Sequence, residues 1–385
     1  LMQLVAYGAQ DIYLTGNPQI TFFKVVYRRH TNFSMEAIEQ TFNGTAGYGN
    51  RVSTTISRNG DLVNRMYLEY TQSGVDATAC ANPGTALVDN IELEIGGQQI
   101  DKHYGHWMEA WFQLTELNPS GCNPLCADVA IQSSEATSWT TFQKMSGSGG
   151  VKGATDTMER TFLPLTFWFC RNPGLALPLI ALQYHEVKVI VTFNSQTACG
   201  GNTTFGSAQL WADYIYLDTD ERRRFAQVSH EYLIEQVQFT NSSTASTSHD
   251  LNFNHPVKEL IWTGGVTTSG PAATTGPSTP ILLASGPYKV VLNGHDRFAE
   301  RDLKYFTRAQ VWQHHNGHGS VNVVDSIAVY SFALKPEEHQ PSGTCNFSRI
   351  DNAQLKCPSD ALYIYAVNYN VLRIMSGMGG LAYSN

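Results

Sequence analysis

Apolar and polar residues alternate with a period of two along much of the chain, and this feature limits the fold more than any other. Residues 91–95 alternate Ile, Glu, Leu, Glu and Ile, as a half-buried strand does, because successive side chains of a strand point to opposite faces. The same period, or a richness in β-branched and aromatic residues, predicts further strands at 21–29, 62–70, 187–193, 210–216, 231–240, 321–332 and 363–371. The 32 glycines and 15 prolines supply turns for many short strands, so the sequence predicts an all-β chain.

Length and charge narrow the class of protein. A chain of 385 residues is long enough for two large all-β domains. The net charge of −8 argues against wrapping of nucleic acid, which requires a basic surface. Charged residues make up only 15%, which suits a protein that buries surface against partners. No segment has the apolar length of a membrane span, and the N-terminal residues lack the pattern of a signal peptide.

One long helix and two long loops interrupt the strand pattern. Trp107, Trp111, Leu114 and Leu117 recur at helical spacing, which predicts a helix over 103–117 that buries these side chains in the core and ends at Pro119. A second, short helix is predicted over 301–309. The segments 119–156 and 264–286 are rich in Gly, Ser, Thr and Pro, and we expect them to be surface loops.

Short matches between the two halves predict an internal duplication. The run EIGGQ at 94–98 resembles VLNGH at 291–295, an offset of 197 residues, and each run precedes a predicted helix. The runs 184–189 and 369–374 give a second match at an offset of 185. Two all-β halves of this size suit two consecutive eight-stranded jelly rolls, a double jelly roll, with short helices and long surface loops and a linker near 218–227.

No residue pattern predicts catalysis or a cofactor. The chain has neither a phosphate-binding P-loop nor a nucleophile elbow. Its seven cysteines are odd in number and widely spaced, which favours reduced thiols; only Cys122 and Cys126 lie close enough for half a metal site or a local disulfide. We therefore expect no enzyme, no metal and no cofactor.

Histidines and arginines form the other candidate clusters. His314, His315 and His318 offer three imidazoles within five residues, yet the neighbouring glycines favour a solvated turn over a metal site. For His103 and His106, which flank the helix start, we expect a packing or capping role. The basic run 222–224 predicts a solvated linker or an intersubunit salt bridge rather than a nucleic-acid contact.

Five Asn-x-Ser/Thr triplets are candidate glycosylation sites, and they begin at Asn32, Asn43, Asn202, Asn241 and Asn346. Such triplets arise often by chance in a chain rich in these residues. A product that never enters the secretory route would not be modified by the ordinary machinery.

Several long motifs resemble one viral family. The N-terminal runs LVAYGAQD and YLTGNPQITFFKVVYRRHTNF, at 4–11 and 13–33, resemble the N-terminal signature of the major capsid proteins of nucleocytoplasmic large DNA viruses. Four later stretches resemble the same family in the same order, at 172–182, 292–298, 330–349 and 369–374. The resemblance covers nearly the whole chain, apart from the loops at 119–156 and 264–286.

The resemblance implies a structural role without catalytic residues. It implies a double jelly roll whose homotrimer has six jelly rolls in a pseudo-hexagonal outline and tiles an icosahedral virion shell around a membrane and a DNA genome. The corresponding division is an N-terminal arm at 1–20, a first jelly roll at 21–218, a linker at 219–227 and a second jelly roll at 228–385. We expect the arm to lie at the capsomer base and to reach toward neighbours or the inner face.

The partners implied are the chain itself, neighbouring capsomers, and minor capsid and penton proteins, with the internal membrane layer as a further candidate. Sequence-specific nucleic-acid binding is not expected. The implied location is the virion capsid, assembled in the host cytoplasm. Two alternatives stay open: a minor double jelly-roll capsid protein of the same virus class, and a jelly-roll glycan-binding module that stacks sugars on loop aromatics such as Trp139 or Tyr288.

Overall fold

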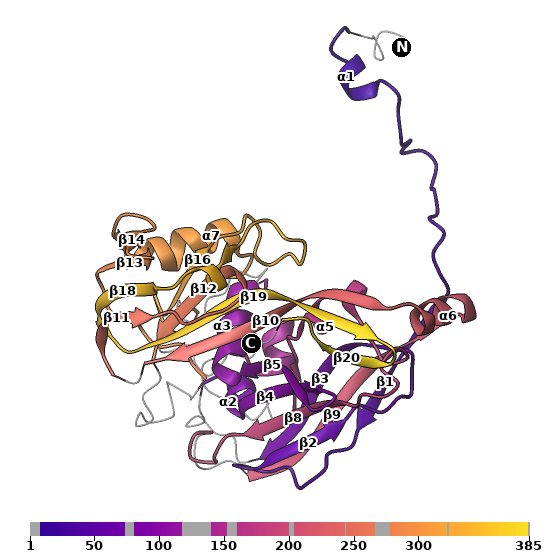
Figure 1. Ribbon diagram of the computed structural model, residues 1–385, viewed down its shortest axis with the longest axis horizontal. Helices are drawn as coiled ribbons and strands as arrows, with labels where there is room; N and C mark the ends of the chain where they lie inside the picture. Colours follow the sequence, from indigo (N-terminus) through magenta and orange to yellow (C-terminus); the bar gives the residue numbers. More distant parts are fainter. Residues whose placement is uncertain are drawn as a thin grey trace. The chain divides into compact units, whose positions relative to one another are not determined.

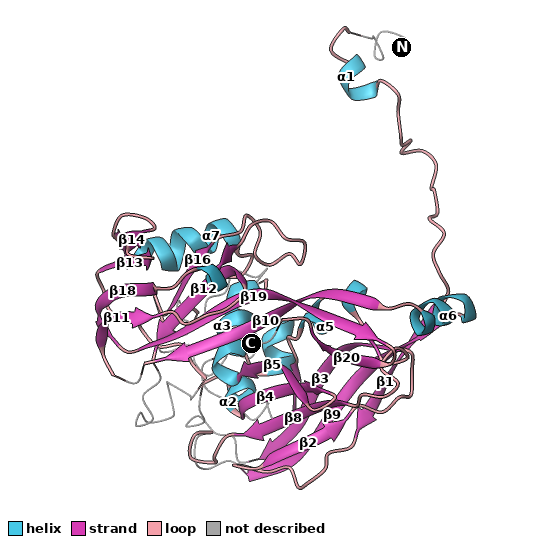
Figure 2. Ribbon diagram, in the orientation of Figure 1, coloured by secondary structure: helices cyan, strands magenta, loops and turns pink. Residues whose placement is uncertain are grey.

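Strands dominate the computed structural model, and the helices between them are short (Figures 1 and 2). The structure describes residues 8–73, 81–117, 140–151, 160–199, 204–242, 244–265, 278–321 and 323–383. Residues 34–385 form one compact unit and residues 1–33 form another. The prediction of an all-β fold is confirmed. Among the described residues, no helix combines the length and apolar character needed to cross a membrane.

The first half of the compact unit contains two sheets. One has the strand order β1-β9-β3-β6, with the short β7 beside β3, and the other has the order β2-β8-β4-β5. The strands are β1 (Phe33–Gln40), β2 (Arg51–Thr55), β3 (Leu62–Ser73), β4 (Val88–Ile95), β5 (Gln98–Tyr104), β6 (Arg160–Pro164), β7 (Leu177–Pro178), β8 (Val187–Phe193) and β9 (Thr204–Leu217).

The second half repeats the arrangement of the eight main strands. Its sheets have the orders β10-β19-β12-β16 and β11-β18-β13-β14, with the short β17, β20 and β15 at their sides. The strands are β10 (His230–Asn241), β11 (Ser246–Asp250), β12 (Pro256–Gly264), β13 (Pro287–Leu292), β14 (His295–Asp296), β15 (Arg301–Asp302), β16 (Ile327–Ser331), β17 (Cys345–Asn346), β18 (Ala353–Asp360), β19 (Leu362–Met375) and β20 (Met378–Leu381). Each half is thus an eight-stranded jelly roll, as predicted.

Of the two sequence matches that predicted the repeat, one is confirmed and the other is wrong. The β4–β5 turn at Gly96 and Gly97 and the β13–β14 turn at Asn293 and Gly294 both have positive φ at their two central residues, so the 197-residue match joins equivalent hairpins. The 185-residue match is wrong. It pairs the start of β8 with part of β19, and these strands hold different places in their sheets, because alternation alone does not distinguish one strand from another.

The helices follow the strand pairs that they were predicted to follow. Helix α3 (Gly105–Thr115) buries Trp107, Trp111 and Leu114, but Leu117 is 67% exposed, because the helix ends at Thr115 and the chain turns away in an extended conformation. The second predicted helix begins at Leu303, later than expected, and runs through the π-helix η6 (Tyr305–Ala309) into α7 (Gln310–His314). The other helices are α2 (Pro83–Ala86), α4 (Thr141–Ser146), α5 (Trp168–Arg171), α6 (Thr219–Gln227), η5 (Pro173–Leu175) and η7 (Phe347–Arg349).

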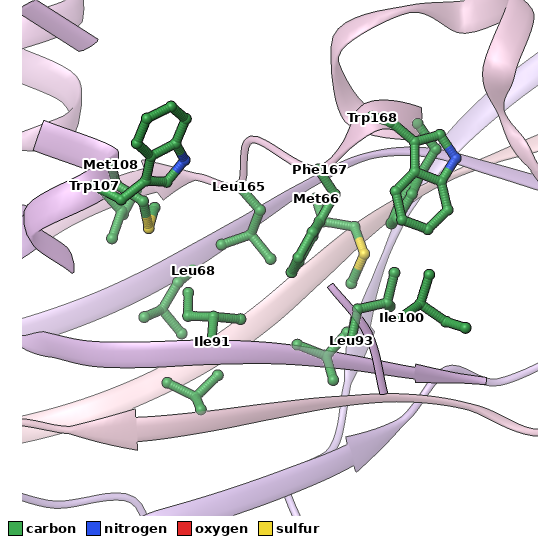
Figure 3. Close-up of a cluster of buried hydrophobic side chains, with 14 of the residues drawn as sticks. Met66, Leu68, Ile91, Leu93, Ile100, Trp107, Met108, Leu165, Phe167 and Trp168 are labelled. Atoms are coloured by element: carbon green, nitrogen blue, oxygen red, sulfur yellow. The ribbon is translucent and has the colours of Figure 1, made fainter. Parts of the chain in front are cut away.

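The largest hydrophobic cluster lies between the two sheets of the first roll and continues to helix α3 (Figure 3). Met66 and Leu68 of β3 face Ile91 and Leu93 of β4, and each of the four side chains is at most 2% exposed. Residues of the second roll also belong to this cluster, while a second cluster fills the interior of the second roll. The two rolls therefore share a continuous apolar contact.

Helix α6 connects the two rolls. It lies between β9 and β10, and Asp218 caps its N-terminus by accepting a hydrogen bond from the N–H of Thr219. The basic run 222–224 is exposed to solvent, as predicted for a solvated linker, and within it the Nε of Arg222 lies 3.0 Å from Oδ1 of Asp61 in the same chain.

In the N-terminal unit, residues 1–33, the described part from residue 8 onward contains one short helix, α1 (Ile12–Thr15). The strand predicted at 21–29 is absent. These residues have no partner strand, and their side chains are exposed, including Phe23 at 99% and Tyr27 at 87%. β-branched and aromatic composition favours a strand only where a neighbouring strand and a core are available.

Candidate functional site: the contact faces of the two rolls

The first roll covers the outer face of the sheet β10-β19-β12-β16 in the second roll. Ile261 of β12, together with Tyr365 and Val367 of β19, belongs to the cluster that the first roll builds, and each is at most 1% exposed. The intervening residues, such as Trp262, point the other way into the second roll's own cluster. Both faces of this sheet are therefore buried in a single chain.

Helix α3 supplies much of this cover. The ring of Trp107 lies 5.1 Å from the ring of Tyr365, and Nδ1 of His106 lies 3.1 Å from the Tyr365 hydroxyl oxygen. Burial lowers the pKa of His106 to about 3, so the ring is neutral at neutral pH. His103 is also buried and stacks on Phe167 at 4.5 Å. The predicted packing role of both histidines is confirmed.

The edge strand β5 adds polar contacts at the same junction. The backbone N–H of Val237 donates to Oδ1 of Asp101 at 3.1 Å. The side-chain amide of Gln236 donates to the carbonyl of Ile100. These bonds fix the position of the first roll along strand β10, because each donor and acceptor is directional.

A buried charge cluster lies beside these contacts. Glu235 of β10 is approached by Arg171 of the first roll at 2.6 Å, by Lys258 of β12 at 2.7 Å and by His339 at 3.5 Å. Burial alone would raise the pKa of Glu235, but the charges of Arg171 and Lys258 outweigh it and hold the pKa below its usual value. Lys258 has no exposed side-chain surface, and burial lowers its pKa. The pairing of Arg171 with Glu235 joins the two rolls.

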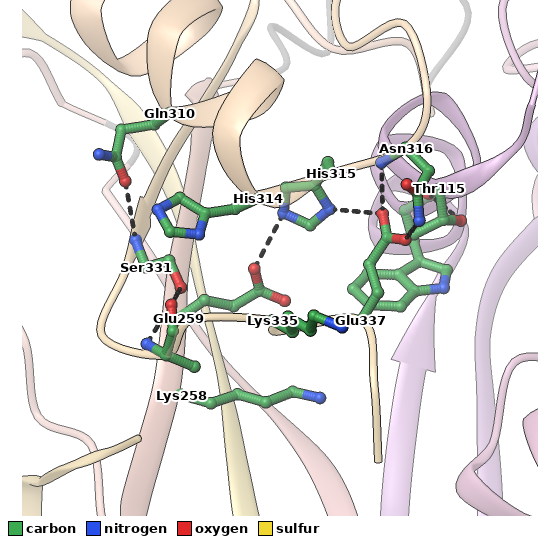
Figure 4. A network of polar contacts seen from close by, with 12 residues as sticks. Thr115, Lys258, Glu259, Gln310, His314, His315, Asn316, Ser331, Lys335 and Glu337 are labelled. Atoms are coloured by element: carbon green, nitrogen blue, oxygen red, sulfur yellow. Dashed lines mark hydrogen bonds and ion pairs between the residues drawn. The ribbon is translucent and has the colours of Figure 1, made fainter. Parts of the chain in front are cut away.

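His315 lies between two carboxylates of the second roll (Figure 4). Its Nε2 is 3.0 Å from Oε2 of Glu259 and its Nδ1 is 3.0 Å from Oε1 of Glu337. Burial alone would lower the pKa of His315, but the two glutamates outweigh it and raise the pKa to about 9. The predicted solvated turn is wrong here: the His315 side chain is fully buried, because its partners come from distant parts of the sequence.

The equivalent sheet of the first roll, β1-β9-β3-β6, has no such cover within the described ranges. Tyr67 pairs with Trp211 across β3 and β9, as Ile261 pairs with Tyr365 across β12 and β19. Tyr67, Trp211 and the neighbouring Phe162 of β6 are nevertheless partly exposed. One sheet face is thus buried in the second roll and open in the first.

A pocket of about 740 Å³ opens on this face between the sheet, helix α3 and helix α4. Its lining is mainly apolar and includes Tyr67, Trp111, Phe112, Phe142, Met145 and Phe162. Glu116 and Asp213 also line it, and burial raises the pKa of both carboxyl groups. The pocket can therefore hold an apolar group that carries one hydrogen-bond donor.

The candidate residues from the sequence differ in their burial, and some of them lie outside the described residues. Asn32, Asn43, Asn241 and Asn346 are exposed, while Asn202 lies outside the described residues. Cys122, Cys126, Trp139 and most of both long loops also lie outside them. In the ranges that are described, no three His, Cys, Asp or Glu side chains converge on a metal position, and Tyr288 is buried in the second roll. The Tyr288 finding removes one of the aromatics considered for sugar stacking.

Sequence analysis did not identify Arg171, Glu235 and Lys258 as a cluster. One signal was available: Lys258 and Glu259 interrupt a strand that is otherwise apolar, VKELIW, and buried charges occur only where they are paired.

Comparisons with known proteins agree with this geometry. Residues 21–218 match the family model described as major capsid protein N-terminus, and residues 221–380 match the model described as large eukaryotic DNA virus major capsid protein. The chain is 51% identical to the major capsid protein of Pyramimonas orientalis virus and 45% identical to that of Paramecium bursaria Chlorella virus 1, covering 100% of this chain and 99% of each relative.

Solved structures give the same result. A chain of the PBCV-1 virus capsid, at 41% identity, superposes with a TM-score of 0.73 over 95% of this chain and 100% of that chain. The Faustovirus major capsid protein, at 12% identity and a TM-score of 0.67, shares the fold. With two family models that together span most of its length, the chain belongs to the family of major capsid proteins of large eukaryotic DNA viruses.

Proposed function

We propose that this chain is the main structural unit of an icosahedral virion shell and that it works as a homotrimer with a pseudo-hexagonal outline. The observation that carries this proposal is the sheet face that is covered in the second roll and open in the first. A sheet face that carries Tyr67, Trp211 and Phe162 calls for a partner surface.

A second copy of the chain can supply that surface. Within one chain, the side of the first roll that carries β5 and α3 packs on the outer sheet of the second roll. The second roll has the same fold, so its side that carries β14 and α7 can pack in the same way on the open sheet of another copy. Such a head-to-tail contact forms a ring when the rotation closes. Six nearly equivalent rolls close the ring with three chains.

The finer assignments extend this proposal. We propose a first roll ending near 218, a linker over 219–227 and a second roll from 228, which is supported by the position of α6 (Thr219–Gln227) between β9 and β10. We extend the arm proposed for 1–20 to residue 32, because β1 begins at Phe33 and residues 8–32 contain no strand.

The proposed partners are neighbouring capsomers, minor capsid and penton proteins, and the internal membrane layer, with assembly in the host cytoplasm. We also propose that the chain has no enzymatic role. The four exposed asparagines remain candidates for attached sugars, which intact-mass measurement of the native protein would reveal.

The mass of the native protein in solution tests the trimer. Sedimentation or native mass spectrometry should give three times 42.6 kDa. A stable monomer at micromolar concentration would refute the proposal. Abundance in purified particles separates the alternatives: thousands of copies support the main shell protein, whereas a few copies support a minor capsid protein.

A further inference from the structure

Trp312 on helix α7 is an unusual surface residue. Its side chain is 82% exposed, whereas its helix neighbour Val311 is only 4% exposed. Tryptophan is rarely left in water without a partner, and it is enriched among the residues that dominate protein interfaces. Trp312 thus marks a contact that the isolated chain leaves unmade.

The position of α7 in the second roll corresponds to that of α3 in the first. Both helices follow the β4–β5 or β13–β14 hairpin and precede the next strand, β6 or β16. Helix α3 also carries a tryptophan near its end, Trp111, which is 5% exposed. Its ring lies 6.3 Å from the ring of His315, the residue that directly follows α7, and 5.1 Å from the guanidinium carbon of Arg171.

The contact between the two rolls of one chain identifies the site that Trp312 would meet if the second roll of one copy packed in the same way on the first roll of another copy. In the chain, a tryptophan of α3 packs on the segment that follows α7. Between two copies, the tryptophan of α7 in one copy would pack on the segment that follows α3 in the other copy. That segment begins at Glu116 and includes helix α4. Glu116 and the α4 residues Phe142 and Met145 line the pocket of about 740 Å³ on the open sheet face.

We propose that Trp312 of one copy inserts into this pocket of the next copy and anchors the contact between subunits. The lining aromatics, Trp111, Phe112, Phe142 and Phe162, provide the apolar and edge-to-face contacts that an indole prefers. A buried indole N–H needs an acceptor, and Asp213 and Glu116 of the lining can accept it, while the third lining carboxylate, Glu337, already accepts from His315 and Asn316. The same solution occurs beside the pocket, where the indole N–H of Trp211 donates to Glu69 at 2.8 Å.

Truncation of the anchor gives the first test of this inference, which rests on the proposed trimer. Trp312→Ala should weaken the association of subunits roughly 30-fold or more per contact, as removal of an interface hot spot does. Its melting temperature as a monomer should not change, because the side chain is exposed. Tyr383→Ala, which removes another exposed aromatic side chain (62%), is the matched control and should leave association unchanged. Unchanged association of Trp312→Ala would refute the anchor.

A pair of introduced cysteines gives the second test and shows where on the other copy position 312 docks. In a Cys170→Ser background, which removes the native thiol that lines the same pocket, Trp312→Cys combined with Met145→Cys should form covalent dimers and trimers under mild oxidation, whereas Trp312→Cys combined with Val228→Cys and each single variant should not. If the unmodified chain is a trimer but the first pair gives no cross-link above its controls, the docking of Trp312 is refuted and the proposed function stands. If the unmodified chain is a monomer, the proposed function itself fails.

Discussion

The Nζ of Lys258 lies 2.7 Å from Oε1 of Glu235, and the two side chains are 0% and 2% exposed. The pair belongs to β12 and β10 of the second roll, while Arg171 approaches the same carboxylate from the first roll. A charge in this position cannot return to water when its partner is removed.

We therefore predict that Lys258→Met destabilises the chain by about 3 to 5 kcal/mol, because Glu235 loses a neutralising charge in a buried site. Thermal or denaturant unfolding measures the change. The matched control is Lys335→Met, which breaks the exposed pair with Glu338 and should alter stability by less than about 1 kcal/mol. Equal effects of the two substitutions would contradict the importance of burial.

Alkaline pH should lower the free energy of unfolding, because His315 loses its proton. Its pKa in the folded chain is about 9, above the ordinary value of 6.5, so the folded state holds a proton that the unfolded state has released. The resulting stability is fully present below pH 6.5 and is lost as the pH rises through 9. The contribution is on the order of 3 kcal/mol.

The unfolding free energy measured from pH 6 to 10 tests this prediction. Other groups of the chain also change protonation with pH, so the comparison is with His315→Gln, which keeps a hydrogen-bond donor but cannot gain a proton. The decline in stability between pH 7 and 9 should be smaller in the variant. Parallel curves for both proteins would rule out His315 as the titrating group.

We predict that Glu109 holds the segment that follows α4 in its folded conformation. Its buried carboxylate accepts hydrogen bonds from the backbone N–H groups of Gly149 and Gly150 and from the side chains of Thr85 and Gln113. Glu109→Gln turns an acceptor into a donor that faces other donors, which should cost about 2 to 4 kcal/mol. Hydrogen exchange at Gly149 and Gly150 should accelerate.

Glu116→Gln, at the residue that directly follows the same helix, is the control and should leave this exchange unchanged. Equal protection of Gly149 and Gly150 in the Glu109 variant and the unmodified chain would show that the carboxylate does not hold the segment.

Removal of residues 1–32 should leave the folding of the chain intact but impair the formation of shells. The side chains of 12–32 are exposed, so we expect the melting temperature of the truncated chain to stay within a few degrees of the full-length value. Assembly of shells, followed by electron microscopy, should fail or become irregular. Normal shells built from the truncated chain would exclude an assembly role for the arm.

Local pattern was sufficient for elements whose neighbours are close in sequence. The helical spacing of Trp107 and Trp111 predicted a buried helix, and the turn residues at 96–97 and 293–294 identified equivalent hairpins. Resemblance in long motifs gave the family and the double jelly roll, which the two family models and the repeated strand order confirm.

Pattern failed where the outcome depends on distant partners. Residues 21–29 have strand composition but no neighbouring strand, and His315 lies in a glycine-containing segment but is buried by Glu259 and Glu337, 56 residues before it and 22 after it. The cluster around Glu235 assembles four separate segments in the same way. Only the folded chain brings these groups together.

The covered sheet of the second roll has a consequence for the speed of assembly. A ring of six rolls has six junctions, and in three of them the partners are already tethered by helix α6. Each tethered junction avoids the loss of translational and rotational freedom that separate molecules suffer on association, an estimated cost of roughly 4 to 15 kcal/mol. Bringing three chains into one ring requires two encounters between molecules, whereas six separate rolls would require five, so joining two rolls in one chain removes three collisions from the route to a capsomer.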